Sequence, residues 1–99
     1  MATATDREIR RHILRFVHTG ENGKSLSRIV YQQLLDYGHR IVWSEFDRHL
    51  LYLERAECLT SAFVHPTVDR LRWLSITGKG LQILEGSADD PGIMPPNEI

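Results

Sequence analysis

The chain has 99 residues, which is enough for one small domain with a single hydrophobic core. It is 41% hydrophobic and 25% charged, as ordinary globular proteins are, and its net charge of -1 excludes a strongly basic chain. Any contact with nucleic acid must therefore come from a local cluster of cations. Cys58 is the single cysteine, so an intramolecular disulfide is excluded.

No apolar run approaches the roughly 18–20 residues that a membrane-spanning helix needs. The first residues, Met-Ala-Thr-Ala-Thr-Asp, contain no apolar signal core. We therefore expect a cytoplasmic protein that has no membrane partner.

A first helix is predicted to begin near Thr5, which has the spacing of a capping box with Glu8. Its apolar stripe is formed by Ile9, Ile13 and either Phe16 or Val17.

Four arginines of this helix lie mostly off the stripe, namely Arg7, Arg10, Arg11 and Arg15. They form either a solvated helix face or a face that contacts phosphate.

A second helix is predicted from Ser25 or Ser27, either of which can cap it, to about Asp36. Gly38 suits the left-handed position that follows a helix. The next residues, 40–43, favour β-structure and are expected to form a minor third strand.

A third helix is predicted to start at Ser44, with Asp47 in the right place for a capping box. Phe46, Leu50 and Leu53 share one face and form its core stripe. The other face carries charged and polar residues: Glu45, Arg48, His49, Tyr52 and Arg55.

Residues 59–64 and 70–76 are predicted to form a two-stranded ribbon, joined by a hairpin loop over residues 65–69. We expect Leu74 and Ile76 to face the core, which leaves Trp73 partly exposed as a surface for a partner. A last helix is predicted over residues 77–85. Residues 86–99 are interpreted as a flexible tail with little core content.

The order helix, helix, helix, ribbon, helix resembles the winged-helix superfamily. The segment Trp73-Leu74-Ser75-Ile76-Thr77-Gly78-Lys79-Gly80 is similar to the L-T-x-x-G segment that closes the wing in these proteins. The resemblance covers about residues 6–85. It implies a mainly α fold with a small antiparallel β-sheet, a winged helix-turn-helix domain over residues 1–85 and a tail over 86–99.

The Gly- and Pro-containing tail is also similar to that of small ArsR-like winged-helix proteins of Mu-like phages and prophages. The chain departs from the pattern in two ways. Glu57 or Cys58 stands where many winged helices have Gly after the third helix. The cysteine pair of metal-sensing members is missing.

The resemblance implies a homodimeric DNA-binding regulator of transcription, of phage or prophage origin. Its dimer contacts would come from the first and last helices, with Trp73 or Leu81. Arg48 would make a bidentate contact with guanine. The candidate residues for contact with double-stranded DNA are Lys24, Arg28, Ser44, Arg48, His49, Tyr52, His65, Thr67, Arg70 and Arg72. The acidic residues of the third helix favour the wing arginines as the DNA contacts and leave a protein-interaction module as the alternative function.

Other chemistries are not predicted. The five histidines do not have an established ligand spacing, so we expect neither a metal nor a cofactor. Cys58 is interpreted as a small core residue. The sequence contains no phosphate loop, nucleophile elbow or convincing carboxylate pair, so we do not expect an enzyme.

Overall fold

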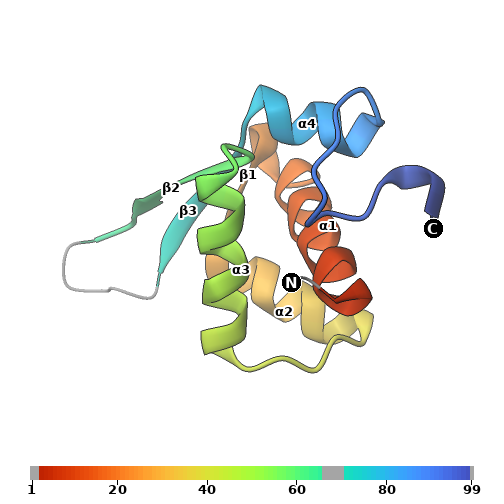
Figure 1. Cartoon of the computed structure of the whole chain (residues 1–99). Helices are drawn as coiled ribbons and strands as arrows, with labels where there is room; N and C mark the ends of the chain where they lie inside the picture. The colour runs from red at the N-terminus through yellow and green to blue at the C-terminus, as the bar shows by residue number, and fades with distance from the viewer. Residues whose placement is uncertain (1–2, 66–70, 99) are drawn as a thin grey trace.

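The computed structural model describes residues 3–65 and 71–98. This part of the chain is mainly helical with a small antiparallel sheet, which confirms the expected fold class (Figure 1). The helices are α1 (Ala4–His18), α2 (Ser27–Tyr37), α3 (Trp43–Arg55) and α4 (Gly78–Glu85), with short 3-10 turns at Glu21–Gly23 and Pro96–Glu98. The strands are β1 (Lys24–Leu26), β2 (Leu59–Phe63) and β3 (Arg72–Ile76). None of the described helices is long and apolar enough to cross a membrane.

The hydrophobic core is built around α1. The predicted stripe of α3, formed by Phe46, Leu50 and Leu53, is fully buried, as are Ile13 and Val17 of α1. Each such side chain stabilises the fold by about 1.5–3 kcal/mol relative to an exposed position. Burial of these stripes holds α1 and α3 together and fixes which face of α3 is turned outward.

The sheet has the strand order β1-β3-β2, and both pairings are antiparallel. Leu74 of the central strand is fully buried, whereas Trp73 is 45% exposed, so the predicted directions of both side chains are confirmed. The prediction of a third strand over residues 40–43 is wrong. The third strand is β1, before α2, and its Ser25 pairs with Leu74.

The predicted capping residues of the first three helices are corrected by the structure, although α2 does begin at Ser27. The capping box of α1 is formed by Thr3 and Asp6, two residues before the expected pair. Helices α2 and α3 begin without a side-chain cap. The Ser27 hydroxyl instead accepts a hydrogen bond from the backbone N–H of Arg72 at 3.0 Å, which joins α2 to β3. At α4, by contrast, Thr77 caps the helix by accepting from the N–H of Gly80.

Beyond α4, the chain runs back along α1 (Figure 1). Ile93 is only 1% exposed and belongs to the hydrophobic core. The backbone N–H of Met94 donates to the carbonyl oxygen of Arg7 at 3.1 Å. The expectation that residues 86–99 contribute little to the core is therefore wrong at Ile93.

Candidate nucleic-acid interface

The outward face of α3 is the side of this helix that is exposed to solvent. Its exposed residues recur at intervals of three and four positions, which places them on one side of the helix. They are Ser44, Asp47, Arg48, Leu51 and Arg55. This face carries two arginines, one acid, one hydroxyl and a half-exposed leucine.

Arg72 of β3 pairs with two acids of α3. Its guanidinium contacts the carboxylate of Asp47, and its Nη1 lies 3.5 Å from Oε1 of Glu54. Glu54 also accepts a hydrogen bond from the Ser61 hydroxyl at 2.5 Å. Two of the three acids of α3 are thus offset by a cation from the sheet, and the third, Glu45, is partly buried in the first turn of the helix. Arg48 and Arg55 stay exposed on the same face.

The predicted DNA-contacting residues fall into three groups. Those that the structure places at exposed positions are Lys24, Arg28, Ser44, Arg48 and His65. Those that are at least partly buried and engaged by other residues are His49, Tyr52 and Arg72. Thr67 and Arg70 lie outside the described residues.

His49 and Tyr52 lie on the side of α3 that is turned toward α1, which argues against their contacting DNA. His49 is 4% exposed, and its Nδ1 accepts a hydrogen bond from Nε of Arg10 at 3.1 Å. Burial, followed by the nearby Arg10 charge, lowers the pKa of His49. The Arg10 guanidinium lies 3.8 Å above the ring of Tyr52. These contacts tie α1 to α3.

The same cluster holds the end of the chain. The Tyr52 hydroxyl donates to Asp90 at 2.5 Å, and Arg10 donates to the carbonyl oxygen of Gly92 at 3.2 Å. A Cβ on residue 92 would lie 2.1 Å from the Tyr52 hydroxyl oxygen, so a larger residue there would displace the Tyr52 side chain. Burial and the bond to Asp90 raise the pKa of Tyr52.

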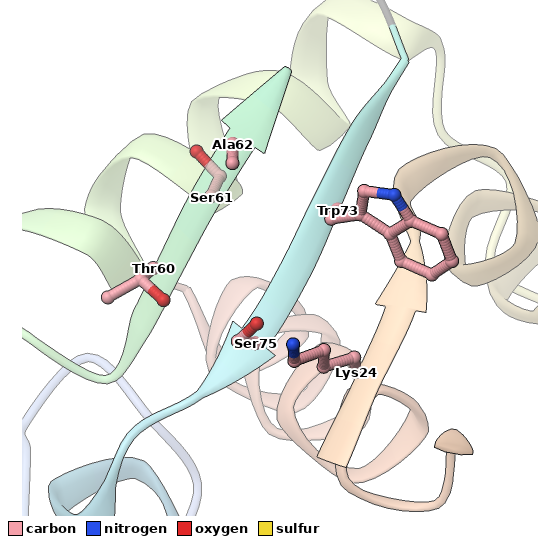
Figure 2. Close-up of a pocket in the computed structure, with 6 residues that line it drawn as sticks. All are labelled: Lys24, Thr60, Ser61, Ala62, Trp73 and Ser75. Atoms are coloured by element: carbon pink, nitrogen blue, oxygen red, sulfur yellow. The ribbon is translucent and has the colours of Figure 1, made fainter. Parts of the chain in front are cut away.

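The outer face of the sheet carries a shallow hollow of about 350 Å³. Figure 2 shows the ring of Trp73 reaching from β3 toward β1, and the Lys24 side chain extending over Ser75. Thr60, Ser61 and Ala62 of β2 line the other side. An aromatic ring and a lysine lie together here, on a surface separate from the outward face of α3.

Sequence reasoning missed two residues of the candidate interface. The sequence places Arg55 on the polar face of the third helix without predicting that it contacts DNA, and Leu51 is not among the predicted DNA contacts. Leu51 is three positions after Arg48, and Arg55 is seven positions after it. A helical projection centred on Arg48 would therefore have placed both residues on the same face of the helix.

Metal-ligating side chains converge at one other place among the described residues. These are Glu8, His12 and His39, which lie between α1 and the turn after α2. Comparison with protein-family models, curated proteins and solved structures gave no match for the chain.

Proposed function

We propose that the protein is a winged-helix DNA-binding protein that regulates transcription, with α3 as its recognition helix. The observation that carries the proposal is the composition of the outward face of α3. Arg48 and Arg55 are exposed there, while Asp47 and Glu54 are paired with Arg72. The helix therefore offers cations where phosphate and base edges would lie in the major groove.

Four of the five exposed residues of α3 have a role at the DNA in this proposal, and the fifth, Asp47, pairs with Arg72. Arg48 reads guanine through a bidentate contact, which is worth about 1–3 kcal/mol of discrimination. Leu51 packs against a thymine methyl group, and Ser44 and Arg55 contact the backbone or a base edge. Arg28, exposed in the first turn of α2, contacts phosphate.

Pairing of Arg72 with the acids changes the assignment made from sequence. The wing is the ribbon of β2 and β3 with the loop between them. Its Arg72 orders the acids of α3 instead of reaching phosphate, so α3 becomes the main DNA contact. Lys24 and His65 supply further exposed groups at the sheet.

The proposed assembly is a homodimer that binds a twofold-symmetric site. Dimerisation through α1 is disfavoured because its apolar stripe is buried within the chain, whereas Trp73 remains 45% exposed on the sheet. We therefore assign the dimer contact to the outer sheet face. A phage or prophage origin belongs to the proposal through the sequence resemblance alone.

A selection experiment tests the proposal. The full chain would be incubated with a random-sequence DNA duplex pool at low salt, where phosphate contacts are strongest. Fluorescence anisotropy would then measure the affinity of the wild type, Arg48→Ala and Arg15→Ala for the selected sequences. Arg15→Ala is the matched control, because Arg15 is an exposed arginine of α1. We expect Arg48→Ala to weaken binding about 10-fold or more and to relax one base position. Failure of the wild-type chain to enrich or bind DNA at low salt would refute the proposal.

A second candidate function is a protein-interaction module that does not bind DNA. The observation in its favour is the apolar exposure at the ribbon, where Phe63 is 62%, Val64 41% and Trp73 45% exposed. Phe63 and Trp73 lie on opposite faces of the ribbon, because Trp73 pairs with Ala62 and Phe63 pairs with Arg72. Exposed apolar side chains at this end of the ribbon would suit a contact with another protein. Loss of partner binding in Trp73→Ala, combined with no DNA binding by the wild type, would favour this function.

A further inference from the structure

Glu8, His12 and His39 bring three potential metal ligands together across two elements. The ligand atoms of all three side chains lie within 4.8 Å of one another. Nδ1 of His12 and Nε2 of His39 are 2.7 Å apart. Glu8 and His12 are four residues apart on α1, so their side chains lie on the same helix face.

The turn after α2 positions His39 next to Glu8 and His12. Gly38 ends α2 with a φ of 117°, in the left-handed region that favours glycine. The N–H of His39 then donates to the carbonyl oxygen of Leu34 at 3.0 Å, which fixes the backbone of the turn. The chain thus crosses to α1 directly after the helix.

Aromatic rings hold both imidazoles in place. Tyr37 stacks on His39 with ring centroids 5.6 Å apart and lies 4.4 Å from the centroid of His12. The ring of Phe16 also lies near His12, with the two ring centroids 6.1 Å apart. His12 is 5% exposed, and Glu8 and His39 are half-buried, so the group is partly shielded and still open on one side.

We propose that Glu8, His12 and His39 bind one divalent ion of the zinc type, with water as the fourth ligand. Two imidazole nitrogens and a carboxylate oxygen are a donor set that zinc accepts, and three protein ligands leave one position open. Zinc–nitrogen bonds of about 2.0–2.1 Å in a tetrahedral site place two nitrogens about 3.3 Å apart. The rings must therefore separate by roughly 0.6 Å relative to their direct hydrogen bond.

The protonation state of His12 suits this role. Burial, followed by the neighbouring His39, lowers the pKa of His12. The charged groups that act on it are Glu8, which opposes this shift, and Arg11 and Arg15, which reinforce it. A neutral imidazole can ligate a metal without first releasing a proton to solvent.

The site would have a structural consequence. His39 belongs to the turn between α2 and α3, while the other two ligands belong to α1. A bound ion would fasten the helix-turn-helix to α1 and stabilise the folded chain, because the unfolded chain does not have the preformed site. This inference does not depend on DNA binding.

Equilibrium dialysis of the full metal-free chain against zinc chloride tests the site. The variants are Glu8→Gln and His39→Gln, and the matched control is His18→Gln, since His18 is an exposed histidine of α1. We expect one zinc ion per wild-type chain. Affinity should fall at least about 10-fold in each site variant, since even partners outside the ligand set contribute 10–100-fold. The control should bind as the wild type does.

Cobalt(II) replaces zinc in a parallel measurement, because its visible absorption reports tetrahedral coordination. The wild type and the control should show the tetrahedral spectrum, and the site variants should lose it. Circular dichroism checks folding, and Glu8→Gln carries the test if His39→Gln unfolds. The absence of zinc binding by the wild type, or equal binding by Glu8→Gln, would overturn the proposal and leave the His12–His39 contact as a hydrogen bond.

Discussion

Helix α1 carries four arginines and helix α3 carries two, and a pair from each helix has opposite surroundings. Arg10 and Arg11 of α1 turn inward and donate to backbone carbonyl oxygens of α4 and of the segment that follows it. Arg48 and Arg55 of α3 point outward and stay exposed. The comparison teaches that an arginine-rich helix is not by itself a phosphate-binding face. The carbonyl groups that pack nearby decide whether the guanidinium is available to a ligand.

The difference follows from what covers each helix. The last segment runs along α1 and brings Ile93 into the core, so Arg10 and Arg11, unlike the exposed Arg15, must find acceptors within the protein. The outward face of α3 has no such cover among the described residues, and Arg72 only offsets its acids. Four predictions test this contrast, from the largest expected effect to the smallest.

Ile93→Ala should lower the free energy of unfolding by about 2–4 kcal/mol, because it leaves a cavity where a fully buried side chain stood. Urea denaturation would measure the change. Ile29→Ala is the control, since Ile29 is 45% exposed and should change stability by less than about 1 kcal/mol. Equal losses in the two variants would mean that the last segment does not complete the core over α1.

Arg11→Ala should cost about 1–3 kcal/mol of unfolding free energy, because Leu84 and Met94 lose their guanidinium donor. Thermal denaturation would measure the effect against Arg15→Ala, which removes an exposed arginine of the same helix and should stay within about 0.5 kcal/mol. The buried Nε of Arg11 has no hydrogen-bond partner among the described residues, which reduces the expected loss. Equal losses of stability in the two variants would mean that the inward arginines of α1 do not stabilise the fold more than the exposed Arg15.

The stability of the contact between α1 and α3 should depend on pH through His49. Its pKa is lowered in the folded protein, mainly by burial, so the unfolded chain binds more protons as the pH falls below about 6.5. Stability should therefore be complete above this pH and decline on acidification. Urea denaturation in a chelating buffer should show that the stability of His49→Gln declines less on acidification than that of the wild type. The stability of His18→Gln should decline as much as that of the wild type. Identical pH profiles for all three proteins would contradict the role of His49.

Asp47→Asn should change the free energy of unfolding by less than about 0.5–1 kcal/mol, because the Asp47 side chain that pairs with Arg72 is 55% exposed. If α3 binds DNA as proposed, the same variant should bind more tightly, with the gain shrinking as salt is raised. Thermal denaturation and fluorescence anisotropy would measure the two effects. A large loss of stability would show that the outer ion pair is structural, against the contrast drawn above.

Local patterns were sufficient to predict much of the helical framework. Apolar residues three and four positions apart identified the stripe of Phe46, Leu50 and Leu53, and Gly38 marked the end of α2. The predicted capping box of α1 was two residues too late, because the pairs Thr3–Asp6 and Thr5–Glu8 have the same spacing. Only the actual first turn selects between two equivalent local patterns.

The candidate interface was predicted only in part. Ser44 and Arg48 lie on the outward face of α3, as spacing on one helix can show. His49 was counted on that face although it is buried, because a polar residue beside the apolar stripe can turn either way. Its partner Arg10 is 39 residues away in the chain, so a window of neighbouring residues contains no sign of the contact.

The sequence by itself determined the helices, their apolar faces and the ribbon, because these depend on residues within a few positions of one another. Tertiary structure alone decided that β1 pairs with β3, that Ile93 enters the core and that Arg72 meets the acids of α3. It also decided that His12 meets His39. Each of these contacts joins segments that are distant in sequence, and packing of the whole chain, rather than local spacing, sets their partners.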